Sequence, residues 1–169
     1  VTLAEAIQGR ELARKAGAES LGKDYQAAEE EFLELSRAIE KEDLRYAQRN
    51  QAAVTEQFRQ LEIRAIKIQT IGEVRNLLRA AEKQKSDKIA PESYTAAKNK
   101  LAEADTFITE NPYQKEQMGM LANEALFLAR RHMEIAAETS KIQQMTPEQT
   151  ALRMEAIRDP LTNLYNRRY

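Results

Sequence analysis

The chain has 169 residues, 42% of them hydrophobic and 31% charged, a composition typical of a folded globular or elongated protein rather than a disordered one. Its 26 basic and 27 acidic residues give a formal net charge of −1, so no overall field favours nucleic acid or an anionic membrane as a partner. The absence of cysteine excludes disulfides, thiolate metal sites and cysteine nucleophiles. No apolar run approaches the length of a membrane span, and residues 1–10 lack the basic and apolar regions of a signal peptide.

Two helices are predicted before a much longer one. Apolar spacing indicates helices at 2–20 and 23–41, with Gly22 in the turn between them. Residues 43–83 contain no proline and a single glycine, so they predict one long helix with Asp43 as its N-cap.

The long helix carries apolar residues on two sides. Leu61 and Ile63 point about 200° apart, with Phe58 on the side of Leu61 and Ile66 on the side of Ile63. We therefore expect it to be the central helix of an all-α domain, with earlier segments packed on one face and later segments on the other.

Proline and polar residues mark the later helix boundaries. Residues 85–90 form a predicted polar connector, and Pro91 begins a helix at 91–110. A cap, a first-turn proline and a capping-box partner then recur twice, predicting one helix that reaches about residue 144 and a short last helix. The two sets are Asn111, Pro112 and Gln114, and Thr146, Pro147 and Gln149.

The second half of the chain resembles the first after a shift of 69 residues. We predict a duplication of residues 23–72 as 91–142, each copy being a short helix, a tight turn and a long helix. The expected fold is an elongated antiparallel helical bundle of two duplicated hairpins around the long central helix, covering residues 1–145. The seven identities pair Tyr25, Ala27, Ala28, Ile39, Ala53, Phe58 and Ile66 with Tyr94, Ala96, Ala97, Ile108, Ala122, Phe127 and Ile135.

His132, the only histidine, lies in a stripe with core-like helical spacing, which favours a structural or interfacial role over catalysis. A di-iron bundle would need a glutamate three residues earlier, where this chain has Ala129, and a second histidine. We therefore predict no metal site.

The remaining polar and methionine clusters also assign no site. Glu29, Glu30 and Glu31 are consecutive, so they point in different directions and are interpreted as a solvated face. Met118 and Met120 could form a soft binding surface or fill core space. The basic residues Arg130, Arg131 and Lys141 are too few to indicate a phosphate site. No catalytic, cofactor-binding or metal-binding residue is predicted.

Residues 159–169 carry the most specific motif. Asp159, Leu161, Thr162, Leu164, Asn166 and Arg167 follow the pattern Asp-x-Leu-Thr-Gly-Leu-x-Asn-Arg, with Asn163 in place of glycine. This segment resembles the opening of a GGDEF domain, the catalytic domain of diguanylate cyclases. In that family the metal-binding and nucleotide-binding residues lie farther along, so the resemblance implies a truncated start of the domain with no catalytic residues. Residues 146–158 are expected to be the stalk helix that leads into it.

A second resemblance covers about residues 4–155. The runs LEIRAIK at 61–67, IGEVR at 71–75 and APESYTAA at 90–97 are similar to helical repeat regions of bacterial envelope lipoproteins that precede an OmpA-like peptidoglycan-binding domain. This resemblance implies the periplasm or outer membrane, whereas a cyclase domain, which uses GTP, implies the bacterial cytoplasm.

The leading functional hypothesis is a non-catalytic regulatory, sensory or dimerisation region that controls an attached GGDEF domain from the cytoplasm. Its expected partners are that domain, a second copy of the chain, and an unidentified protein or small-molecule signal. No cofactor and no nucleic acid is expected. The alternative is a periplasmic helical scaffold or spacer of an OmpA-like lipoprotein.

Overall fold

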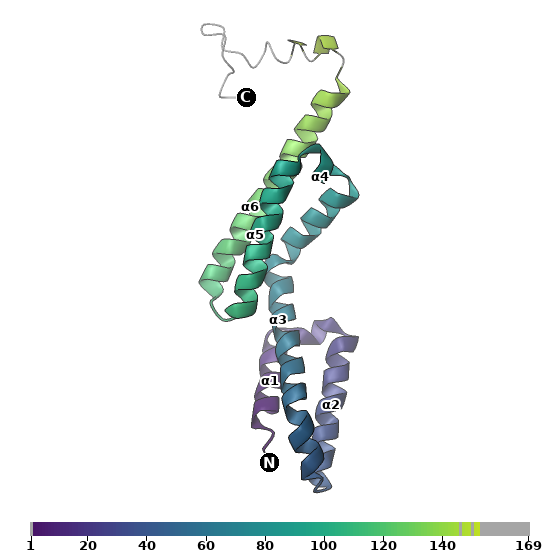
Figure 1. Ribbon diagram of the computed structural model, residues 1–169, viewed down its shortest axis with the longest axis vertical. Coiled ribbons are helices and arrows are strands. Elements are labelled where there is room, and N and C mark those ends of the chain that lie inside the picture. Colours follow the sequence, from purple (N-terminus) through teal and green to yellow (C-terminus); the bar gives the residue numbers. More distant parts are fainter. Residues whose placement is uncertain (1, 146, 150, 153–169) are drawn as a thin grey trace.

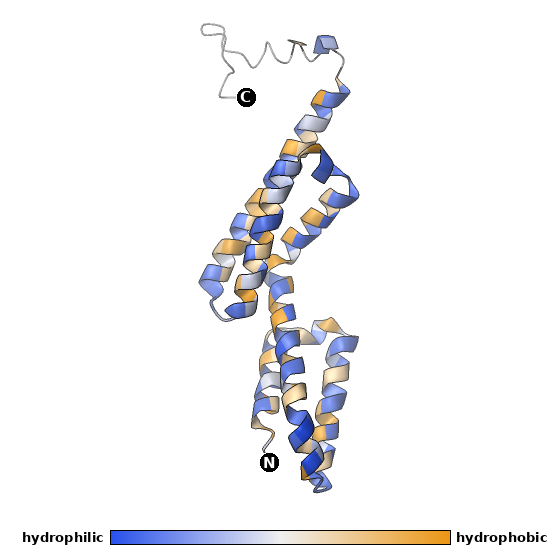
Figure 2. Cartoon of the chain, viewed as in Figure 1, coloured by the Kyte–Doolittle hydropathy of each residue, from blue (hydrophilic) through white to orange (hydrophobic). Residues whose placement is uncertain are grey.

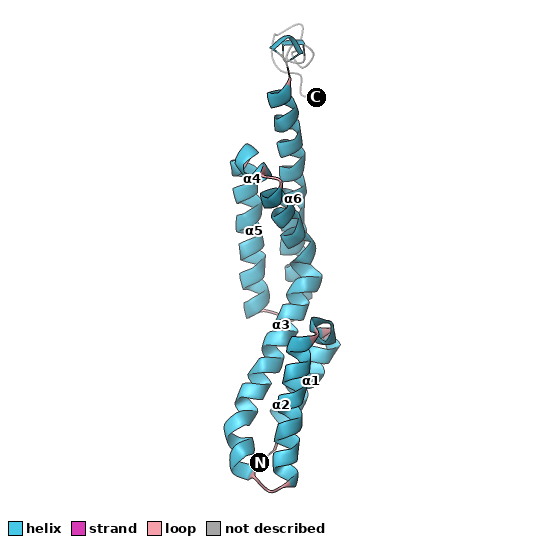
Figure 3. Ribbon diagram, turned by 90° about the vertical axis from the view of Figure 1, so that its right-hand side faces the viewer, coloured by secondary structure: helices cyan, strands magenta, loops and turns pink. Residues whose placement is uncertain are grey.

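The computed structural model describes residues 2–145, 147–149 and 151–152, and every regular element within these ranges is a helix (Figure 1, Figure 3). The all-α prediction is therefore confirmed. Of the predicted stalk at 146–158, residues 147–149 and 151–152 are helical. The rest of that stalk and the GGDEF-like segment at 159–169 lie outside the described residues. None of the helices in the described ranges is both long and apolar enough to cross a membrane.

The first bundle is formed by α1 (Ala4–Lys15), α2 (Lys23–Glu40) and the N-terminal half of α3 (Leu44–Lys83). Helix α1 is shorter than the predicted 2–20. Gly17 has a left-handed φ of 81° that ends the helix, and a separate 3-10 turn, η1 (Ala18–Leu21), follows it. Gly22, with φ of 64°, then turns the chain into α2 as predicted.

Helix α3 is continuous over 40 residues and is shared by two bundles. Asp43 caps it as predicted, because its carboxylate accepts a hydrogen bond from the backbone N–H of Tyr46 at 3.2 Å. The C-terminal half packs with α5 (Pro91–Glu110) and α6 (Lys115–Gln144), while α4 (Ser86–Ile89) connects α3 to α5. The helices that precede α3 therefore pack on its N-terminal half, and those that follow it pack on its C-terminal half (Figure 1). The prediction separated them by the face of α3 alone.

Two boundary predictions in the second bundle are corrected. Residues 85–90 are not only a connector, because they contain the helical turn α4. The capping box at Asn111 and Gln114 does not form: α6 starts at Lys115, Gln114 is its N-cap residue, and no side chain caps it. Instead the Gln114 side chain donates to the side-chain oxygen of Asn111 at 3.1 Å, so both residues belong to the turn.

The two bundles repeat the same order of elements. Gly17 and Lys85, 68 positions apart, both have positive φ, 81° and 59°, and each precedes a single helical turn, η1 or α4. A long antiparallel hairpin follows in each case: α2 with α3, and α5 with α6. The duplication itself stays a prediction, but the repeated architecture begins earlier in the chain than the predicted unit 23–72.

Burial shows where the shift of 69 residues holds. In α2 and α5 it pairs buried positions, such as Ala28 with Ala97. In α3 and α6 it does not, because Phe58 is fully buried and Phe127 is 64% exposed. An interval of 71 restores the match there and pairs Phe58 with the buried Ala129. The interval changes because α5 and the turn after it are longer than α2 and its turn.

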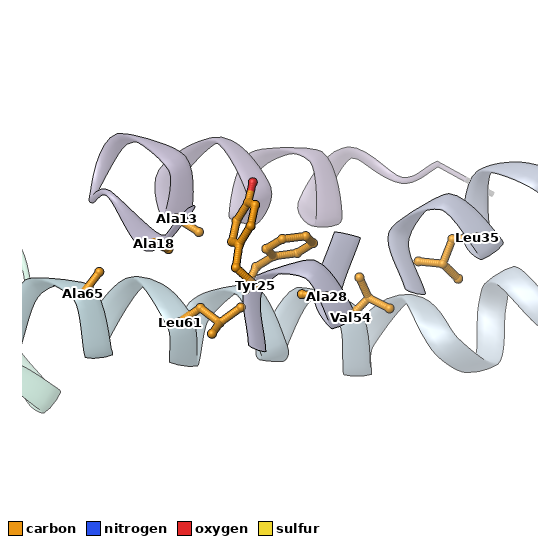
Figure 4. Packing of buried hydrophobic residues seen from close by; sticks show 9 residues of the cluster. Ala13, Ala18, Tyr25, Ala28, Leu35, Val54, Leu61 and Ala65 are labelled. Atoms are coloured by element: carbon orange, nitrogen blue, oxygen red, sulfur yellow. The ribbon is translucent and has the colours of Figure 1, made fainter. Parts of the chain in front are cut away.

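The core of the first bundle is built around Phe58. The rings of Tyr25 and Phe32 each approach it edge-on, with centroids 6.2 Å away. Small residues let the backbones come close, and Figure 4 shows Tyr25 between α1 and α3 with Ala28 and Val54 farther along. Figure 2 shows apolar and polar residues alternating along each helix, as expected for amphipathic helices that bury one side.

Candidate functional site

His132 is the central polar residue of the second bundle, and its side chain is fully buried. Its Nε2 lies 3.0 Å from Ser86 Oγ, and its Nδ1 lies 2.8 Å from Ser93 Oγ. The ring of Tyr94 meets the imidazole edge-on at 5.6 Å between centroids. Helices α4, α5 and α6 therefore meet at this imidazole.

Each of the two serine hydroxyls lies within hydrogen-bond distance of both the imidazole and a backbone carbonyl. Ser86 Oγ also lies 3.1 Å from the Ala81 carbonyl, and Ser93 Oγ lies 3.2 Å from the Ala90 carbonyl. Each hydroxyl has one proton, and a neutral imidazole donates one hydrogen bond and accepts one. A neutral His132 therefore accepts a hydrogen bond from one serine hydroxyl, and the proton of that hydroxyl no longer points to its backbone carbonyl.

Burial lowers the pKa of His132, and the nearby negative charge of Asp87 partly opposes this shift. Asp87 Oδ1 is itself buried and accepts no hydrogen bond from the described part of the chain. A fully buried imidazole cannot meet a substrate unless the bundle opens. The arrangement therefore supports the structural interpretation of His132.

The interpretation of Glu29 as part of a solvated face is wrong, although Glu30 and Glu31 are exposed as expected. Glu29 accepts two hydrogen bonds from the guanidinium of Arg10, at 2.7 and 2.9 Å, and one from the Tyr25 hydroxyl at 2.6 Å. Mainly the Arg10 hydrogen bond lowers the pKa of Glu29, while burial and the hydrogen bond to Glu29 raise the pKa of Tyr25 to about 12. This cluster joins α1 to α2 and keeps its carboxylate ionised.

The two methionines do not form one surface. Met118 is buried in the second core, whereas Met120 is 58% exposed on the opposite side of α6. Met118 is thus core filler, one of the two predicted alternatives.

The basic residues do not converge either. Arg130 forms an ion pair with Glu73 at 2.9 Å, and Arg131 and Lys141 are exposed elsewhere on α6. Among the described residues, no three histidine or carboxylate side chains are placed to hold a metal ion.

A groove of about 670 Å³ lies where the two bundles meet, and sequence analysis did not find it. Its wall combines α1, α3 and the turn between α5 and α6. The carboxylate of Glu62, whose residue is only 4% exposed, accepts hydrogen bonds from the Tyr113 hydroxyl at 2.9 and 3.2 Å. Burial and this contact raise the pKa of Tyr113, and the positive charge of Arg59 partly offsets the rise. Tyr113 thus links the turn between α5 and α6 to the middle of the shared helix α3.

A second groove, of about 580 Å³, contains Arg64, Lys67 and Arg75. Arg64 pairs with Asp24 of α2, and both Lys67 and Arg75 pair with Asp105 of α5. These carboxylates neutralise the cations and connect α3 to its neighbours in both bundles. The two grooves therefore lie at a polar junction between the two bundles.

Comparison of the chain with protein-family models, curated proteins and solved structures finds no match.

Proposed function

We propose that this chain is a non-catalytic regulatory region that controls the geometry of an attached GGDEF domain in the bacterial cytoplasm. The observation that carries the proposal is the arrangement of the two bundles along α3 and the direction in which α6 leaves them. Two helical bundles share one unbroken helix, and α6 leaves the second bundle at the end far from the first (Figure 1). In the sequence, the segment that resembles a GGDEF start follows α6.

Helix α3 supports this role because both bundles are built on it. A ligand or protein that changes the packing of the first bundle acts on the same helix that forms the core of the second, and from there on α6. Such a signal shifts the output only if it binds two arrangements of the bundles with different affinity.

An insertion in α6 tests the proposal in the full-length protein. Two residues inserted after Ser140 rotate the end of α6 by about 200° relative to the bundle, whereas seven residues bring it back to within about 20° of its original direction. We expect the two-residue insertion to change cyclic di-GMP synthesis severalfold and the seven-residue insertion to change it much less. Circular dichroism and thermal unfolding check that both variants fold.

Equal synthesis by the wild type and both folded variants would exclude control through the direction of α6. Equal changes in the two variants would show that the insertion itself, and not the direction of α6, alters synthesis.

The elongated arrangement of the described helices favours one alternative, a periplasmic spacer or scaffold in an OmpA-like envelope lipoprotein (Figure 3). Fractionation of cells that make the full-length protein separates the two proposals. Recovery from the periplasm or outer membrane supports the spacer, and recovery from the cytoplasm supports the regulatory region.

A further inference from the structure

Helix α6 has an outer face on which four large apolar side chains are exposed. Exposed fractions are 58% for Met120, 64% for Phe127, 36% for Ile135 and 39% for Ile142. These residues recur at intervals of 7, 8 and 7, so they form one stripe on a helix. The stripe lies opposite the buried alanines of α6, such as Ala129. We call this stripe, with the charged residues that interrupt it, the outer face of α6.

Three charged residues lie within the outer face, Glu124, Arg131 and Glu138, at intervals of seven residues. Glu124 and Arg131 are seven residues apart, so both lie on the stripe, on either side of Phe127. Glu124 makes an ion pair with Lys100 at 3.0 Å but stays 55% exposed at its side chain. Arg131 is exposed and forms no ion pair with the described part of the chain. Both charges are thus available to a partner.

A shallow hollow of about 420 Å³ lies beside Phe127, lined by Asn123, Glu124, Phe127 and Leu128. A second aromatic ring that entered it would meet the ring of Phe127 and the side chain of Leu128. Aromatic pairs of this kind add to the free energy of association beyond the area that they bury.

We propose that the outer face of α6 binds the same face of a second copy of this chain, with the two helices antiparallel. The twofold axis passes between Phe127 and Leu128. In this register each Glu124 faces Arg131 of the second copy, each Met120 faces Ile135, and each Phe127 faces the hollow at Leu128. The remaining charge, Glu138, faces the uncharged Gln117. The face is therefore complementary to itself in both charge and apolar contacts, as a twofold interface requires.

A parallel pair does not have this complementarity. It places Glu124 against Glu124 and Arg131 against Arg131, and like charges facing each other across an interface disfavour association. The antiparallel pair also directs the two C-terminal ends of α6 in opposite directions. The proposal concerns this chain alone and does not rest on the proposed control of an attached domain.

Charge reversal tests the register. Arg131→Glu or Glu124→Arg places like charges together twice in each dimer, and we expect each to weaken dimerisation on the order of tenfold, measured by sedimentation equilibrium. The double variant Glu124→Arg with Arg131→Glu restores opposite charges and should recover most of the affinity. Arg49→Glu is the matched control, because it makes the same charge change on an exposed position of α3 in the first bundle and should have no effect.

Single cysteines test the orientation, since the chain has no cysteine of its own. Met120→Cys and Ile135→Cys are prepared separately, and each is oxidised alone and as a mixture. In the antiparallel register the thiols of two Met120→Cys chains lie roughly 22 Å apart along the helix, too far for a disulfide. Only the mixture should therefore give a cross-linked dimer.

Three outcomes overturn the proposal. Cross-linking of either variant alone indicates a parallel pair, failure of the double charge reversal to recover affinity rejects the Glu124 and Arg131 contact, and a monomeric wild-type chain rejects the interface. Circular dichroism confirms that each variant keeps its helices, so a loss of dimer is not a loss of fold.

Discussion

The two bundles share an order of elements but fill their cores differently. In the first bundle, Phe58 occupies the centre with the rings of Tyr25 and Phe32 around it. In the second, the position 71 residues later is Ala129, and the buried polar group is His132, which corresponds to Leu61. Ser86, which binds His132, corresponds to Ala18, 68 residues earlier.

The difference shows that one backbone arrangement accepts two kinds of core. An aromatic core obtains its stability from buried area and close contact. A buried imidazole between two hydroxyls needs each helix in one position, because an unsatisfied polar group is costly. Each bundle also has a polar cluster that joins its helices, around Glu29 in the first and around His132 in the second.

The largest expected effect is a difference in stability between alanine variants of Phe58 and Phe127, which the shift of 69 residues pairs. Phe58→Ala should lower the free energy of unfolding by about 3–5 kcal/mol, because it leaves a cavity in a fully buried site. Phe127→Ala, at the position identical in sequence after the shift of 69, should change it by less than about 0.5 kcal/mol. Urea unfolding followed by circular dichroism, at concentrations where the chain is monomeric, measures both. Similar losses would contradict the different burial of these rings.

The polar core of the second bundle can be converted into that of the first. His132→Leu removes hydrogen bonds to Ser86 and Ser93 and should cost about 1–3 kcal/mol. Adding Ser86→Ala recreates the Ala18 and Leu61 pair and should recover part of this loss. Leu61→His is the reciprocal control and should be worse than His132→Leu, because Ala18 offers no hydroxyl. A double variant less stable than His132→Leu would show that the two cores are not interchangeable.

The second bundle should also respond to pH through His132. Its pKa is lowered in the folded chain by burial, so below the unfolded value of about 6.5 the unfolded chain binds the proton more readily. The contribution of neutral His132 to the free energy of unfolding is therefore fully present above about pH 6.5. It is lost as the pH falls from that value toward the lower pKa of His132 in the folded chain. We expect stability to fall more steeply between pH 7 and 5 in the wild type than in His132→Leu. Parallel pH profiles would show that His132 does not titrate on unfolding.

The smallest effects concern the two left-handed residues that end corresponding helices. Lys85 has a φ of 59°. Lys85→Gly should raise the free energy of unfolding by about 0.5–1 kcal/mol, because glycine adopts this conformation without strain. Gly17→Ala should lower the free energy of unfolding by about 1–2 kcal/mol, since alanine is strained there and its Cβ would lie 3.0 Å from the Gln69 amide nitrogen. Thermal unfolding of the two variants checks the opposite signs.

Local sequence was sufficient for the helices themselves. Periodicity and capping residues depend on neighbours within a turn or two, so the 40-residue α3, its cap at Asp43 and the start of α5 at Pro91 follow from the sequence. The same signals failed at Asn111 and Gln114, because these two side chains bind each other in the turn instead of capping α6.

Contacts between distant residues were decided only by the tertiary structure. Glu29 has the sequence context of a surface residue until Arg10, 19 residues away, is brought beside it. Glu62 and Tyr113, 51 residues apart, meet only because the second bundle folds back along α3. The partners of His132 lie 39 and 46 residues away, on α5 and α4. Helical periodicity places a residue on a face, but it carries no information about which polar group of another helix that face will meet.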